Sequence, residues 1–366
     1  MKPHDEILQE AVAFLRDEVG PRANEMDMDL GALKWALDEL CSRNLMALRR
    51  PVEYGGPGFG EPLFRDFQEA VARYSGSLAF LQTQHQSAGS MIAKGENEAL
   101  KKEALPKIGG GERLIGIGFS QLRRPGPPML RADRTGAGYK LTGSVPWVTG
   151  FGLFGEFLIG ASLEDGRAVF GVVPFVPTRR GNGEIAFSEP MRLAAMESPQ
   201  TVSATLTDFL LPDEDTAFIK PAGWIQNNDM INITLQGFFA LGCARAGLDQ
   251  LTAAYERKQS AFIKEAFDKL DGELASCRER TIEVQESGDE EVTTDEKLAI
   301  RAWAIDLAVR CAHAGVTAHS GAANSVRHPA QRVYREALVY TVSAQTTGIM
   351  QATLERLAGR GQVKAP

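Results

Sequence analysis

The spacing of apolar residues changes twice along this chain of 366 residues, and the order of the changes constrains the fold more than any single motif. Residues 1–113 carry apolar side chains at helical spacing, whereas residues 114–220 form short β-rich runs separated by Gly, Pro and Asp. Helical spacing returns over residues 221–366 in long segments, one of them from about Met230 to Gln259. We therefore predict an α+β protein: an N-terminal α-helical domain, a central small β-barrel or sandwich, and a C-terminal four-helix bundle.

Composition and charge exclude several classes of protein. The net charge of −7 makes the chain a poor binder of nucleic acid or anionic membranes, because both require clustered positive charge. No apolar run is long enough to span a membrane, and the charged N-terminus lacks the apolar core of a secretory signal. The four cysteines are far apart and show no metal-ligand spacing. We expect a cytoplasmic protein with reduced, buried thiols, no metal, and no nucleic-acid or membrane partner.

One β-hairpin has the features of a flavin-binding wall. The stretch GAGYKLTGSVPWVTG, residues 136–150, ends in an aromatic residue and a hydroxyl, Trp147 and Thr149. A flavin needs a flat apolar surface and hydrogen bonds to its ring edge, which such a pair supplies. The alternative is that Trp147 packs into the core of the β domain.

Five motifs then occur in a distinctive order: EYGGPGFG, GYKLTGSVPWVTG, TVSATLTDFLLP, YERKQ and HPAQRVYREALVY. Together they resemble the acyl-CoA dehydrogenase family, flavoproteins that oxidise acyl-CoA thioesters between Cα and Cβ, and the resemblance covers essentially the whole chain. It implies the matching fold, FAD as cofactor, and a small-molecule substrate such as an acyl-CoA. Because the family builds its flavin sites across subunits, it also implies a homodimer or homotetramer.

The resemblance assigns flavin contacts to both ends of the β domain. It implies that Trp147 flanks the flavin ring and that Thr149 hydrogen-bonds near its reactive nitrogen. Phe119 and Ser120 stand in the segment that contacts the flavin and its phosphates, although the next residues, Gln121-Leu122, replace the family's Glu-Pro. The two arginines that follow, at positions 123 and 124, either contact phosphate or form a solvated loop pair.

Three further cofactor residues are implied in the C-terminal part. Arg257 matches an arginine that reaches the adenine-phosphate end of a flavin held by a neighbouring subunit; otherwise it is a surface helix arginine. Gly321 belongs to a second stretch that contacts the neighbour's flavin, although the family's Gln there is Thr317. Thr346 matches the threonine of the family's Tyr-Glu-Gly-Thr tetrad, and we expect it to touch the flavin.

The glutamate of that tetrad, the usual catalytic base, is replaced by Ala344 in this chain. Without a carboxylate over the α-carbon, removal of an α-proton is slow. Asp229 approaches the base position that some members use, provided that the alignment slips by two residues. We interpret Glu336 as structural, because it belongs to a helix-anchoring pair with Arg335.

A missing base leaves three functions open. The first is an FAD-dependent oxidoreductase that oxidises a CH–CH bond of an acyl-CoA or similar substrate. The second is a flavin-dependent monooxygenase on the same fold, which is favoured by Ala344 and by His85, a predicted acid–base residue among glutamines in FLQTQHQSAGS. The alternative for His85 is an exposed helix face. The third function is a catalytically silent binding paralogue.

Overall fold

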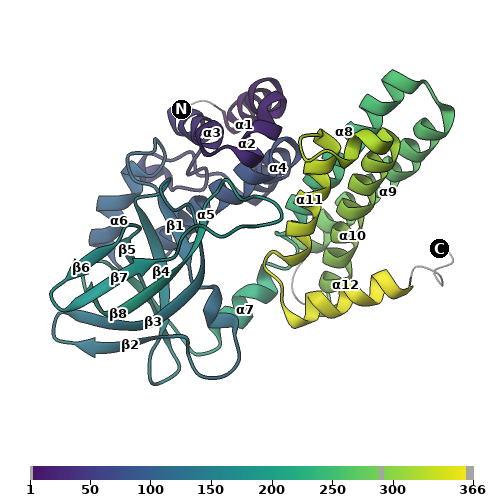
Figure 1. Ribbon diagram of the computed structural model, residues 1–366. Helices are drawn as coiled ribbons and strands as arrows, with labels where there is room; N and C mark the ends of the chain where they lie inside the picture. Colours follow the sequence, from purple (N-terminus) through teal and green to yellow (C-terminus); the bar gives the residue numbers. More distant parts are fainter. Residues whose placement is uncertain (1–2, 288–291, 360–366) are drawn as a thin grey trace.

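The computed structural model describes residues 3–287 and 292–359, and it consists of three layers in sequence order. N-terminal helices cover one end of a mixed β-sheet, and a bundle of long helices stands beside both (Figure 1). This arrangement confirms the predicted α+β fold class. The exact domain limits stay a prediction, and residues 360–366 of the predicted bundle domain lie outside the described residues.

The described N-terminal layer contains six α-helices; the apolar faces of the first five share one core with the sheet, and the sixth packs in a second apolar cluster. The helix α5 starts at the N-cap Ser75, whose hydroxyl accepts the Leu78 N–H. A short π-helical segment, Leu15–Val19, joins the first two helices without a break. The six helices are α1 (His4–Phe14), α2 (Gly20–Met28), α3 (Leu30–Ser42), α4 (Glu61–Tyr74), α5 (Gly76–Ala93) and α6 (Glu98–Ala104).

The central layer is a single nine-stranded sheet with the order β6-β7-β8-β3-β2-β4-β5-β9, and β1 pairs with β4. Most pairs are antiparallel, whereas β4 runs parallel to both β1 and β2. The strands are β1 (Ile115–Gly118), β2 (Leu130–Thr135), β3 (Gly138–Thr149), β4 (Glu156–Ser162), β5 (Ala168–Pro174), β6 (Thr178–Arg180), β7 (Gly183–Phe187), β8 (Thr201–Pro212) and β9 (Thr216–Lys220).

A bulge near the end of β3 sets the direction of Trp147. The register with β8 shifts between Val145 and Val148, so that β3 carries one extra residue there. Pro146 lies in this interval, and proline fits a bulge because it has no N–H for the ladder. Val148 and Thr149 on both sides of the sheet are buried, whereas Trp147 is exposed. Bulges often redirect a side chain beside a functional site, and this one turns the indole out of the core.

In the C-terminal layer the long helix α10 packs against α8, α9, α11 and α12, and the short helix α7 lies between this bundle and the sheet (Figure 1). The helix α8 also crosses α4 closely, because a side chain at Gly242 would lie 2.2 Å from the backbone oxygen of Glu69. The helices are α7 (Trp224–Ile231), α8 (Gly237–Lys258), α9 (Ala261–Glu286), α10 (Thr294–His319), α11 (Pro329–Val342) and α12 (Thr347–Gly359). This close contact fixes the bundle relative to the N-terminal helices.

Candidate active site

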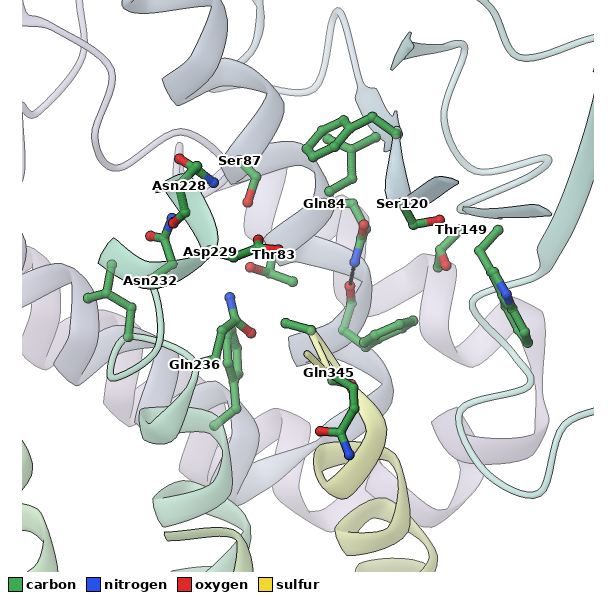
Figure 2. A pocket seen from close by; sticks show the side chains of 18 of the residues that line it. Thr83, Gln84, Ser87, Ser120, Thr149, Asn228, Asp229, Asn232, Gln236 and Gln345 are labelled. Atoms are coloured by element: carbon green, nitrogen blue, oxygen red, sulfur yellow. Dashed lines mark hydrogen bonds between the residues drawn. The ribbon is translucent and has the colours of Figure 1, made fainter. Parts of the chain in front are cut away.

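A cavity of about 1100 Å³ opens where the three layers meet. Its walls come from α5, the end of β3, the 3-10 turn Ser120–Arg123, the α7 segment, the start of α8, and the turn between α11 and α12. Figure 2 shows side chains from these elements converging on one space. A volume of this size is sufficient for a cofactor ring together with part of a substrate.

The wall from the β domain combines an exposed indole with hydroxyl groups. Trp147 is 47% exposed and lines the cavity. Thr149 is buried at the same wall, and its Oγ1 lies 3.0 Å from that of Thr201 in a hydrogen bond. The Oγ of Ser120 is buried without a hydrogen-bond partner among the described residues, and Figure 2 shows it beside Thr149. Phe119 lines the wall behind them, edge-on to Phe170.

The opposite wall is strongly polar. Thr83 and Ser87 of α5 face the α7 region across the cavity (Figure 2). The side chains on the α7 side are those of Asn228, Asp229, Asn232 and Gln236. Of the residues on the α7 side, the sequence pointed to Asp229 alone, and nothing in the spacing of Asn228, Asn232 and Gln236 places them opposite α5.

Arg123 and Asp229 form the main ion pair of the cavity. The Nε and Nη2 atoms of Arg123 donate to Oδ2 and Oδ1 of Asp229, each at 2.7 Å. The pair joins the Ser120–Arg123 turn to α7 and is mostly shielded from solvent, with 27% and 13% of the two side chains exposed. Both carboxylate oxygens of Asp229 therefore accept a hydrogen bond from Arg123.

The turn between α11 and α12 supplies the floor. Ser343, Ala344 and Gln345 line the cavity, and the backbone of Ala344 has a left-handed φ of 49°. Beneath the turn, Nη2 of Arg301 donates to the Ser343 carbonyl at 3.4 Å. Burial lowers the pKa of Arg301 to about 10. Thr346 is absent from the lining residues, and its Oγ1 accepts the Ile349 N–H at the start of α12.

Comparisons with known proteins agree with this geometry. Residues 2–112 match the N-terminal domain of acyl-CoA dehydrogenases. Mitochondrial isovaleryl-CoA dehydrogenase of Pongo abelii is 23% identical over 96% of this chain and 87% of its own. The structure of butyryl-CoA dehydrogenase from Megasphaera elsdenii superposes with a TM-score of 0.78 and 19% identity, covering 97% of this chain and 98% of its own. The chain therefore has the acyl-CoA dehydrogenase fold, and its residues 2–112 match the N-terminal domain of that family.

Further similar proteins are named for different substrates. A 3-(aryl)acrylate reductase of Clostridium sporogenes is 20% identical over 96% of this chain and 97% of its own. The glutaryl-CoA dehydrogenase of Mycobacterium smegmatis, solved in complex with FADH2, superposes with a TM-score of 0.81 and 16% identity, covering 97% of this chain and 94% of its own. At these identities the family relationship does not specify the substrate of this acyl-CoA dehydrogenase-like protein.

The structure places His85 away from the chemistry predicted for it. The imidazole is fully buried and does not line the cavity. Its Nδ1 accepts the Ile115 N–H at 2.8 Å, and its Nε2 donates to the Ile108 carbonyl at 2.9 Å. Burial lowers the pKa of His85, so the ring is held neutral. Both nitrogens are engaged by backbone, and we now propose that His85 fastens α5 to β1 rather than acting as an acid–base residue. The alternative of an exposed helix face is excluded as well.

Arg257 and Gly321 lie outside the lining of this cavity. Arg257 is exposed at the end of α8, where its Nη2 lies 2.8 Å from Nδ1 of His319. Gly321 is exposed in the turn Ser320–Asn324, and a side chain there would meet no atom within 4 Å. Their predicted flavin contacts therefore stay a proposal, and they need a cavity supplied by another subunit.

Glu336 occupies the position of an internal anchor. It is fully buried, and its Oε1 accepts hydrogen bonds from the Gly76 N–H at 3.1 Å and from Nη1 of Arg332 at 2.8 Å. Burial raises the pKa of this carboxyl. These contacts tie α11 to the start of α5, in accordance with the structural role that the sequence predicts.

Within residues 3–287 and 292–359, no cluster of His, Cys, Asp or Glu side chains could hold a metal ion. In the same ranges, none of the helices combines the length and the apolar content that crossing a membrane requires. All four cysteines are free and buried, and burial raises the pKa of Cys41 to about 11.

Proposed function

We propose that this protein is an FAD-dependent oxidoreductase that acts on an acyl-CoA or a similar small molecule. The observation that carries the proposal is the exposed indole of Trp147 beside the hydroxyls of Ser120 and Thr149, at the wall of a large cavity. A structure of an acyl-CoA dehydrogenase from Bacillus anthracis, 20% identical to this chain, is complexed with FAD. The family therefore supports the same cofactor here.

The residues at the β wall fit the needs of a flavin. The Trp147 side chain offers a flat apolar surface, and the unpartnered Oγ of Ser120 offers a hydrogen bond that nothing in the described chain takes up. Thr149 is held in place by Thr201, so its hydroxyl is preorganised. When bound, FAD would supply the two-electron acceptor that an oxidation of this kind requires.

Three cations at the cavity suit the phosphates of a coenzyme A group. Lys94, Arg124 and Lys220 line the cavity, and no carboxylate pairs with them in the part of the chain that the structure describes. Lys94 and Arg124 are exposed, whereas Lys220 lies over the ring of Phe218 at 4.8 Å. Phosphate groups bind such cations through charge-assisted hydrogen bonds. This supports an acyl-CoA substrate and gives Arg124 the phosphate contact that the sequence left open.

The position of the catalytic base gives a reason to retain a second function. Ala344 has no acidic group, and Asp229 is fully engaged by Arg123. A flavin-dependent monooxygenase needs no carboxylate over an α-carbon, so the alanine favours this alternative. Its other support, His85, is withdrawn because both ring nitrogens bind backbone. A silent binding paralogue needs no preserved flavin wall, and the arrangement around Trp147 argues for an enzyme instead.

A homodimer or homotetramer is proposed from exposed apolar residues of the last two helices. Tyr334, Leu338 and Val342 follow one another at helical spacing along α11, and all three are exposed. On α12, Met350 and Leu354 are exposed as well. Contiguous exposed apolar residues commonly mark an interface between proteins. A cytoplasmic location is also proposed, and it is supported by the four free, buried cysteines.

The visible spectrum of the purified protein tests the function. We expect the absorbance bands of oxidised flavin, and bleaching of these bands under anaerobic conditions by at least one member of a panel of short- and long-chain acyl-CoAs. A colourless protein that does not take up added FAD would contradict the proposal. A yellow protein that no thioester bleaches, but that hydroxylates a small molecule when a flavin reductase and oxygen are supplied, would favour the monooxygenase.

A further inference from the structure

Beneath the floor of the cavity lies an arginine that pairs with no carboxylate among residues 3–287 and 292–359. Arg301, on α10, lines the cavity, yet its side chain is only 1% exposed. Its one hydrogen bond runs from Nη2 to the Ser343 carbonyl at 3.4 Å, which is long for an N–H donor. The Nε and Nη1 atoms are buried and have no partner among the described residues. This guanidinium is therefore charged, dehydrated and largely unsatisfied.

The other cavity arginines that are shielded from solvent each have a carboxylate partner, which makes Arg301 an exception. The two acidic side chains of the cavity lining, Glu61 and Asp229, are already used in these pairs. A buried charge is costly unless it is paired and hydrogen-bonded. The pairs are Arg49–Glu61 at 2.9 Å, Arg65–Glu286 at 2.8 Å and Arg123–Asp229 at 2.7 Å.

The turn above Arg301 cannot neutralise it. Ser343, Ala344 and Gln345 carry no charge, and they are the cavity-lining residues of that turn. Tyr340, one helical turn earlier on α11, also lines the cavity, and its hydroxyl is buried without a partner in the described part of the chain. Burial raises the pKa of Tyr340, so the hydroxyl stays protonated and is able to donate. An anion at the floor would therefore meet an arginine that the neighbouring turn leaves without a counter-charge.

We propose that the floor of the cavity binds a carboxylate group of the substrate, with Arg301 as its counter-ion. The inference rests on the proposed function for placing the substrate in this cavity, but the binding of the anion itself requires no cofactor. Lys94 and Lys220 also line the cavity, and their positive charges attract anions to it. If Arg301 only capped the end of α11, it would use one hydrogen bond, and its Nε and Nη1 atoms would stay buried without a partner among the described residues.

The test uses two probes that differ in charge and hardly in shape. Butanoate and butanamide are titrated by calorimetry into the purified protein with its bound flavin. We expect butanoate to bind at least about tenfold more tightly, because a hydrogen bond to a charged group contributes more than a neutral one. Arg301→Gln removes the preference, whereas Arg301→Lys retains part of it. The control is Arg280→Gln, which removes an exposed cation of α9 outside the cavity and leaves the preference intact.

A second variant keeps the test valid even where Arg301→Gln fails to fold. Ala344→Glu places a carboxylate in the turn next to Ser343 and should weaken butanoate binding more than Ala344→Gln does, because the two side chains are similar in size and differ in charge. Butanamide should respond equally to both variants. Equal binding of the two probes by the unmodified protein, binding of neither, or a preference that survives Arg301→Gln would overturn the inference. A colourless protein that still prefers butanoate through Arg301 would instead contradict the proposed function alone.

Discussion

Arg123 and Asp229, 106 residues apart in sequence, form a bidentate ion pair in which both hydrogen bonds are 2.7 Å long. The pair closes one side of the cavity by joining the turn after β1 to α7. It also removes the one carboxylate that the sequence offers as a substitute base. The pair therefore has a structural consequence and a chemical one, and each can be measured.

Double-mutant analysis should detect this pair. Arg123→Gln and Asp229→Asn should each destabilise the protein by about 1–2 kcal/mol, and a coupling of about 1 kcal/mol should remain between them, since the partners are in direct contact and mostly shielded. Urea unfolding of the two single variants and the double variant gives this coupling. The exposed pair Arg134–Asp213 serves as the control, with a smaller coupling expected. Strictly additive effects at Arg123 and Asp229 would show that the ion pair contributes nothing.

The flavin wall should depend on Trp147. Trp147→Ala should lower the flavin-to-protein ratio of the purified protein by about tenfold or more, because the ring loses its apolar contact surface. Thr149→Val should have a smaller effect, since it removes one hydroxyl and its bond to Thr201. Absorbance of the protein and of the released flavin measures the ratio. Phe262→Ala, at an exposed site outside the cavity, is the control, and an unchanged ratio in Trp147→Ala would contradict the flavin assignment.

His85 predicts a specific dependence of stability on pH. Burial lowers its pKa in the folded protein, so at pH values below about 6.5 the unfolded chain takes up the proton first. The free energy of unfolding should therefore fall as the pH drops below that value, by at most about 1.4 kcal/mol per pH unit from this group. In urea unfolding between pH 7 and 5, the free energy of unfolding of His85→Gln should depend less steeply on pH than that of the unmodified protein. The exposed His313→Gln is the control; identical pH profiles for the His85 variant and the unmodified protein would refute the argument.

Removing the charge at Arg301 should not destabilise the protein in the absence of ligand. Arg301→Met replaces a buried, unpaired cation with an apolar side chain of similar length, and such replacements are often neutral or stabilising by about 1–4 kcal/mol. We expect a gain of about 1 kcal/mol in urea unfolding, after the cost of leaving the Ser343 carbonyl unpaired. A loss of more than about 2 kcal/mol would show that Arg301 is needed for the fold itself.

The apolar face of α11 and α12 should determine the oligomeric state. Leu338→Asp and Leu354→Asp introduce charge at residues that are 50% and 58% exposed. Sedimentation velocity should show a shift to monomer, because an unpaired charge within an interface is costly. Val52→Asp, at an exposed apolar residue of the N-terminal layer, should not change the state. A protein that is monomeric without any substitution would refute the proposed assembly.

The order of the three layers could be predicted from the sequence because helical and strand periodicities are local properties. The helix expected from Met230 to Gln259 is instead two helices, since α7 ends at Ile231 and α8 begins at Gly237. No proline or glycine signals a break before Gly237, and tertiary contacts decide it. The bulge that exposes Trp147 depends on pairing with β8, which lies far away in sequence.

The candidate site was predicted less completely, because facing direction and burial are three-dimensional properties. The polar run on α5 is visible in the sequence, but the orientation of the helix decides that Thr83 and Ser87 reach the cavity while His85 is buried. Thr201 meets Thr149 only through the β3–β8 ladder. Arg301 gives no sequence signal at all, since an arginine on a long helix is ordinarily exposed.

Ala344 holds a backbone conformation that alanine gains nothing from adopting. Left-handed geometry at a non-glycine residue costs about 1–2 kcal/mol, and a methyl group makes no compensating hydrogen bond. The bend after α11 is therefore imposed by its surroundings and does not depend on what the side chain at 344 contributes. The side chain at position 344 can accordingly be exchanged without changing the backbone around it. A single substitution there would alter the reactivity of the enzyme while the fold stays the same.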